Sequence, residues 1–177
     1  MTNANTNPTT ATYDMFLVKH DANGNALLAK RAGGIDGDLA SSVTTDGAGN
    51  VYVTGSFDGS SITFGSTILI NAGGSCFFSN CPDMFIAKYD SGGNVLWAQR
   101  AGGTDSDDRA SSVTTDGSGN VYVTGRFNGS SINFGSISLT NSGAVNTVTE
   151  DMFLVKYDSG GNVLWAKSAG GTDSDEA

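Results

Sequence analysis

A stretch of sixteen residues occurs twice in this chain, and it limits the folds that the sequence can adopt. Residues 40–55 and 110–125 are identical except that Ala48 is replaced by Ser118. Each copy contains two short runs rich in Val, Thr and Tyr, separated by an Asp-Gly-x-Gly-Asn turn, which predicts a β-hairpin. Because an isolated hairpin is marginally stable in water, a chain that repeats one is expected to pack its copies together.

Two further motifs recur with nearly the same period. The run Asp-Met-Phe-(Leu/Ile)-(Val/Ala)-Lys begins at Asp14, Asp83 and Asp151, and Ala-Gly-Gly also occurs three times, which defines a unit of about 69 residues. The chain accordingly divides into a polar N-terminal tail (1–12), a half repeat (13–39), a full repeat (40–108) and a second full repeat (109–177) that ends at the start of a further unit.

Each full unit is expected to hold four strands that pair in sequence order as an antiparallel meander. In the second full repeat these are strand A (111–115), strand B (120–127), strand C (152–157) and strand D (162–167). The longer connection between strands B and C contains a small β-like pair around a glycine, which predicts a protruding hairpin or an ordered loop. A β-solenoid is the architectural alternative, but tight Asp-x-Gly-Gly-Asn turns favour antiparallel neighbours.

The pattern VTTDGSGNVYVTG followed by DMFLVKYDSGGNVLWAKSAGG resembles the bacterial beta-propeller repeat family known as SBBP, and more distantly NHL-type blades. This resemblance implies an all-β fold of four-stranded antiparallel propeller-type blades in tandem, in large secreted or surface proteins, with no general catalytic residues. The unit is longer than the 40–50 residues of many propeller repeats. About two and a half blades are also too few for a closed ring of four to eight, so we expect an incomplete propeller or a repeat array.

The formal net charge of −9 argues against nucleic acid and anionic membrane surfaces as partners, since both require a basic surface. No run is long and apolar enough to cross a bilayer. The first twelve residues are polar and do not form a signal peptide. An extracellular or cell-surface location is expected from the resemblance, with a secretion signal outside this sequence.

The two cysteines, Cys76 and Cys81, lie in the divergent part of one B–C connection. A disulfide that closes this short loop would fit an oxidising compartment. Free thiols are an alternative, and zinc is another, although zinc would need two more ligands and only His20 could supply a soft one.

Acidic residues recur in the links between strand D and the next strand A, and oxygen clusters on Gly-rich loops can hold Ca²⁺. The simpler reading is that these Asp side chains form turns by accepting backbone N–H bonds. No cofactor is expected otherwise. The candidate Ca²⁺ ligands are Asp36, Asp38, Asp105, Asp107, Asp108, Asp173 and Asp175.

No catalytic constellation is present, because the single histidine cannot complete a nucleophile–base system. We therefore expect a non-enzymatic extracellular structural or adhesive module that self-associates through an unpaired blade edge, with a filament as the extended form of this assembly. The alternative is a propeller that binds a glycan or a surface protein through its divergent B–C loops. The expected assembly edge is the strand C of the half repeat, made of Met15, Phe16, Leu17, Val18 and Lys19.

Overall fold

The computed structural model describes residues 12–73, 81–104, 106–143 and 149–175, and all regular elements in these ranges are β-strands. In chain order they are β1 (Met15–His20), β2 (Ala26–Ala32), β3 (Asp38–Thr45), β4 (Val51–Phe57), β5 (Ser61–Phe64), β6 (Thr67–Ile70), β7 (Asp83–Tyr89), β8 (Val95–Ala101), β9 (Asp108–Thr115), β10 (Val121–Phe127), β11 (Ser131–Phe134), β12 (Ile137–Thr140), β13 (Asp151–Tyr157) and β14 (Val163–Ala169).

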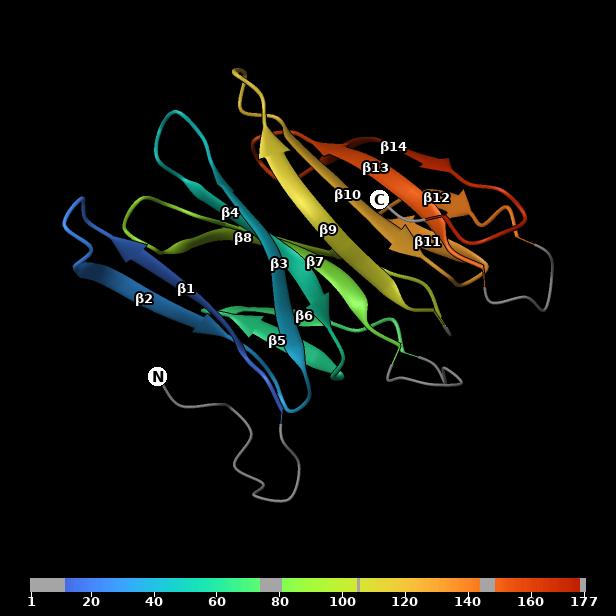
Figure 1. The fold of residues 1–177 in the computed structure, drawn as a ribbon, viewed down its shortest axis with the longest axis horizontal. Coiled ribbons are helices and arrows are strands. Elements are labelled where there is room, and N and C mark those ends of the chain that lie inside the picture. The colour runs from blue at the N-terminus through green and yellow to red at the C-terminus, as the bar shows by residue number, and fades with distance from the viewer. Residues whose placement is uncertain (1–11, 74–80, 105, 144–148, 176–177) are drawn as a thin grey trace.

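The described strands form two four-stranded and three two-stranded antiparallel sheets. We call the four-stranded sheets the first blade (β3-β4-β7-β8) and the second blade (β9-β10-β13-β14), and the sheet β1-β2 the half blade; the other two sheets are the small hairpins β5–β6 and β11–β12. Figure 1 shows them side by side, from the half blade near the N-terminus to β14 near the C-terminus, with β3 and β9 adjacent. The predicted meander is confirmed. The sheets do not close into a ring within the described ranges, as expected from the repeat count.

Each tight turn is held by its own aspartate, as the Asp…Gly-Asn pattern predicts. In the turn between β7 and β8, Asp90 Oδ1 accepts hydrogen bonds from the backbone N–H groups of Gly92 and Asn94, at 2.9 and 2.8 Å. Asp90 Oδ2 accepts one from the Asn94 side chain at 2.8 Å. Gly93 adopts a φ of +79°, which favours glycine. The chain therefore reverses direction here, and the solenoid alternative does not hold.

The small hairpins β5–β6 and β11–β12 are more firmly packed than the predicted protruding loops. Phe64 of β5 is fully buried and contacts Phe85 of strand C, with ring centroids 5.1 Å apart. Phe134 of β11 packs on Phe153 at the same distance. The apolar residues at alternate positions of β5 and β11 therefore belong to the hydrophobic core, where they pack on strand C of the same blade.

Apolar side chains form one core at each of the two junctions between sheets. The core between the half blade and the first blade includes Met15, Val53 and Phe85. The core between the first and second blades includes Tyr52, Ile86 and several residues of β9, β10 and β13. Strand C of the first blade is buried along its whole length because it faces both cores, as its two-sided apolar pattern predicts.

Candidate functional site

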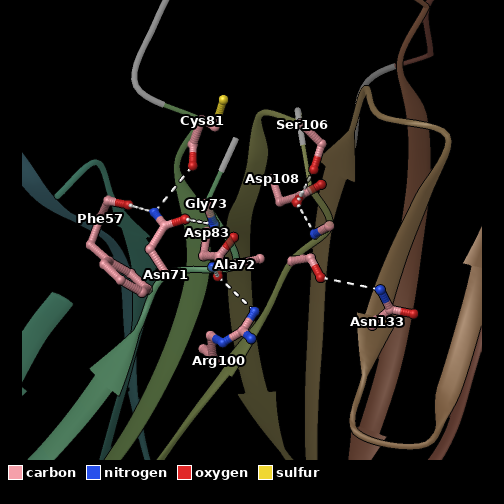
Figure 2. Close-up of polar contacts among 12 residues, drawn as sticks. Phe57, Asn71, Ala72, Gly73, Cys81, Asp83, Arg100, Ser106, Asp108 and Asn133 are labelled. Atoms are coloured by element: carbon pink, nitrogen blue, oxygen red, sulfur yellow. Dashed lines mark hydrogen bonds and ion pairs between the residues drawn. The ribbon is translucent and has the colours of Figure 1, made fainter. Parts of the chain in front are cut away.

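The Ala-Gly-Gly motif lies where strand D of one sheet meets the next blade, and its glycines are required by close approaches. A β-carbon on Gly102 would overlap the carboxylate of Asp83, and one on Gly103 would overlap the carbonyl oxygen of Ser131 in the next blade. Gly102 also forms an isolated antiparallel bridge with Asn133, and its carbonyl accepts a hydrogen bond from the Asn133 backbone N–H at 3.3 Å. The motif therefore joins neighbouring blades (Figure 2).

Two buried carboxylates flank this junction. Asp83 Oδ2 accepts hydrogen bonds from the Ala72 backbone N–H and from Arg100 Nη1, both at 2.8 Å. Asp108 Oδ2 accepts hydrogen bonds from the Ser106 hydroxyl and from the backbone N–H of Gly103, the latter at 2.8 Å. Both side chains come from the first residue of a strand, and Figure 2 shows them on neighbouring strands.

Burial raises the pKa of both carboxyl groups. Loss of solvation is the largest cause in each case, and it raises the pKa of Asp83 to about 6 and that of Asp108 to about 7. The nearby negative charge of Asp83 raises the pKa of Asp108 further. One oxygen of each carboxyl, Oδ1, is buried without a hydrogen-bond partner in the part of the chain that the structure describes. These groups therefore make the blade junction sensitive to pH.

The Ca²⁺ candidates occupy the same junctions, where several of them form turn-closing hydrogen bonds. Asp38 Oδ2 accepts a hydrogen bond from Gly34 N–H at 2.7 Å, and Asp175 Oδ2 accepts one from Gly171 N–H at 2.8 Å. Asp107 instead pairs with the Arg109 guanidinium. Over the described ranges, no three His, Cys, Asp or Glu side chains gather closely enough to hold a metal ion. Asp36 and Asp173 lie in the same links, and Asp105 lies outside the described residues.

A lysine and an aromatic ring of one sheet hold the C–D turn of the next sheet, at the opposite rim. Lys88 Nζ donates to the Ser159 carbonyl at 3.0 Å, and Trp97 Nε1 donates to the same oxygen at 3.1 Å. The equivalent Lys19 donates to the Ser91 carbonyl at 3.1 Å. A lysine at this position of strand C reads from the sequence alone as a charge at the rim with its stem packed. The recurrence of these lysines one unit apart was the signal that could have revealed this contact between blades.

A cavity of about 310 Å³ opens at the junction between the half blade and the first blade. The residue equivalent to Trp97 is Leu28 here, and Leu28 lines this cavity together with Lys19. At the next junction, Tyr52 of strand B is fully buried and packs edge-on against Trp97, with ring centroids 6.1 Å apart. In the part of the chain that the structure describes, no strand B supplies such a tyrosine to the half blade. The other lining residues are Leu17, Val18, Val43, Thr45, Gly49, Val51, Tyr89, Asp90, Ser91 and Gly93.

The predicted assembly edge lies beside this cavity, and its first two side chains differ in exposure. Met15 is buried against the first blade, whereas Phe16 is 67% exposed. The equivalent Phe85 and Phe153 are 0% and 2% exposed, because strand B and the small hairpin of their own blades cover them. Within the described ranges, β1 pairs with β2 alone. The structure thus presents an apolar strand whose second edge has no partner among these ranges.

The structure describes only one of the two cysteines. Cys81 is buried, adopts a φ of +51° and is disulfide-bonded. The expected partner, Cys76, lies outside the described residues. The divergent parts of the B–C connections also fall largely outside them.

A polar groove of about 510 Å³ runs between β8 and the hairpin of the second blade. Its lining includes Gln99, Arg100, Thr104, Ser131 and Asn133, which offer both hydrogen-bond donors and acceptors. The guanidinium of Arg100 is already engaged by Asp83 at 2.8 Å. The groove is thus suited to polar ligands.

Comparison with known proteins agrees with this architecture. Residues 96–133 match the family described as the SBBP beta-propeller repeat, which confirms the resemblance seen in the sequence. An uncharacterised WD repeat-containing protein of Acanthamoeba polyphaga mimivirus is 28% identical over 90% of this chain. The regulatory protein FlaEY of Caulobacter vibrioides is 29% identical over 71% of it. Each alignment spans only 13% of the relative's length. No helix in the described ranges is long and apolar enough to cross a membrane.

Proposed function

Because this chain carries an SBBP beta-propeller repeat at residues 96–133, we propose that it is a non-enzymatic structural or adhesive module that works outside a bacterial cell. The module assembles with copies of itself through the open edge of β1, and repeated assembly of this kind forms a filament. Blade repeats depend on their neighbours to complete a core, so an incomplete blade favours association.

The exposure of Phe16 is the single observation that supports this proposal best. The same residue of the repeat is buried in both complete blades, whereas Phe16 is 67% exposed. The neighbouring apolar residues Val43 and Leu39 are 58% and 48% exposed, although Val113, the equivalent of Val43, is only 5% exposed. A face that is core in two copies and solvent-exposed in the third is expected to find a partner.

Light scattering after size-exclusion chromatography, over a hundredfold range of concentration, tests self-association. We expect the mass to rise with concentration, and Phe16→Lys to shift it back to a monomer because a charge on this face opposes burial. Ile68→Lys is the matched control, because Ile68 is an apolar residue of similar exposure, 59%, on the β5–β6 hairpin and not on β1. A monomer at all concentrations would contradict the proposal, and negative-stain microscopy would distinguish filaments from closed particles.

The second candidate function is the binding of a glycan or a surface protein near the B–C connections. The polar groove beside Arg100 and Asn133 favours it, because its lining can form several hydrogen bonds to a hydroxyl-rich ligand. A glycan array probed with the wild-type chain and with Asn133→Ala tests this function. Specific hits that the substitution weakens would support it, and an array without hits would contradict glycan binding.

A further inference from the structure

We infer that the open edge of β1 is a selective docking site for an A–B hairpin segment of the repeat type that this chain contains. The segment would supply a strand of the pattern Val-Tyr-Val-Thr-Gly in one defined register. This inference rests on the proposed assembly role of the β1 edge, and it names the chemistry of the partner that this edge accepts.

The two complete blades show which strand covers the equivalent edge of strand C. In both complete blades, strand C pairs with a strand B whose glycine lies opposite the buried phenylalanine: Gly55 opposite Phe85, and Gly125 opposite Phe153. A β-carbon on Gly125 would overlap the ring of Phe153. The exposed Phe16 is the third copy of this phenylalanine, and it therefore favours a strand with glycine at the opposite position.

The second argument comes from the cavity beside Lys19. In the first blade, Tyr52 of strand B lies opposite Lys88, whose Nζ is 5.0 Å from the centre of the tyrosine ring. The second blade repeats this contact at 5.0 Å with its own tyrosine and lysine. Lys19 occupies the same place beside the 310 Å³ cavity, which is lined mainly by apolar atoms. A tyrosine from an added strand B would enter this cavity.

Together these contacts fix the register of the added strand. Its glycine would lie opposite Phe16, its tyrosine opposite Lys19, and the valine between them opposite Val18, as in the pairing of β4 with β7. The hairpin that follows strand B would then place a phenylalanine on Phe16, as Phe64 lies on Phe85. Pairing of β1 with β1 of a second copy supplies neither the glycine nor the tyrosine, so the structure favours a true A–B segment.

A peptide with the sequence of residues 38–71 is the direct probe. We expect it to bind the full chain saturably, measured by fluorescence anisotropy. In the peptide, Gly55→Val should weaken binding about tenfold or more, because the new side chain would meet the strand A backbone of Leu39 and Ala40 and would lie opposite Phe16 in the added strand pair. Tyr52→Ala should weaken it by about tenfold through loss of the ring contacts. Ile68→Ala is the matched control and should bind like the parent peptide, because Ile68 is exposed in the blade.

Pairs of cysteines test the register independently of affinity. A cysteine replacing Val53 of the peptide should cross-link to a chain with Val18→Cys, and not to one with Leu17→Cys. No binding, or binding that is indifferent to the Gly55 and Tyr52 substitutions, would overturn the inference.

The failure of this inference is distinguishable from failure of the proposed function. Self-association that Phe16→Lys abolishes, in a chain that does not bind the peptide, would leave self-assembly standing and overturn the hairpin site. Selective peptide binding by a chain that stays monomeric on its own would support the hairpin site and contradict self-assembly.

Discussion

Replacing Trp97 by leucine should weaken the contact between the two complete blades. The equivalent residue of the half blade is Leu28, and the junction there contains the 310 Å³ cavity. The Trp97 ring lies 6.1 Å from that of Tyr52 and 6.4 Å from that of Tyr157, and its Nε1 donates to the Ser159 carbonyl at 3.1 Å. It also covers Gly161 of the next turn, where a β-carbon would meet the indole.

The magnitude follows from a comparison with Trp165, the same residue of the second blade. Trp165 keeps one aromatic partner, Tyr122 at 6.1 Å, and the described residues hold no further blade beyond it. Trp97→Leu therefore loses one more aromatic pair, worth about 0.5–1.5 kcal/mol, and one more hydrogen bond, worth about 0.5–1.5 kcal/mol. We expect Trp97→Leu to cost about 2 kcal/mol more of the free energy of unfolding than Trp165→Leu.

Urea denaturation followed by far-UV circular dichroism measures both variants against the parent chain. A difference of about 2 kcal/mol corresponds to roughly 4–8 °C in melting temperature for a chain of this size. An equal loss in the two variants, or a larger loss for Trp165→Leu, would show that the tryptophan stabilises its own blade and not the junction. The reasoning about the junction would then be wrong.

Three further predictions concern the same junction. Gly102→Ala should destabilise the chain by about 2 kcal/mol or more, because the new methyl group meets the buried Asp83 carboxylate. Gly117→Ala is the control: no atom lies within 4 Å of the new carbon, so the same urea titration should show almost no change in stability. The free energy of unfolding should fall as the pH rises from about 5 to 8, since the pKa of Asp108 is raised from 3.8 to about 7 and the folded state binds the extra proton. Asp108→Asn should make the free energy of unfolding depend less on pH, and an unchanged dependence would exclude Asp108 as its source. Lys88→Met should accelerate hydrogen exchange in the C–D turn of the second blade, because the bond to that turn is lost, and unchanged protection there would contradict the contact.

The strand order could be predicted because local signals decide it. Turn chemistry at positions such as Asp90 and Gly93 forces the chain to reverse, and apolar side chains on both faces of strand C indicate that both faces are covered. The starts of strands A were predicted less well: β9 begins at Asp108, three residues before the predicted Ser111. A bulge between Thr124 and Gly125 displaces the pairing there, and such a shift has no short-range sequence signal.

The contacts between blades could not be predicted, because they join residues about seventy positions apart. The sequence marks Lys88 and the Ser159 turn as repeated, but periodicity does not show that one unit's lysine reaches the next unit's turn. The burial of Asp83 was missed for a related reason. An aspartate at the start of a strand is usually exposed, and here Ala72, which follows the hairpin of the same blade, Gly102 and Arg100 enclose it.

The two rims of a blade junction therefore differ in how they respond to their surroundings. One rim holds carboxyl groups such as Asp83 and Asp108, whose charge is opposed by burial, so that its stability depends on pH. The other rim joins blades through a lysine, a tryptophan and a backbone carbonyl, and no carboxyl group takes part in these hydrogen bonds. If an added A–B segment docks on β1 as inferred, its tyrosine enters the second rim beside Lys19. In a chain carrying His20→Asn, which removes the histidine at the end of β1, docking should then be nearly independent of pH between 6 and 8, even while the stability of the chain itself changes. A strong pH dependence of peptide binding by this variant would place the contact at the carboxylate rim instead.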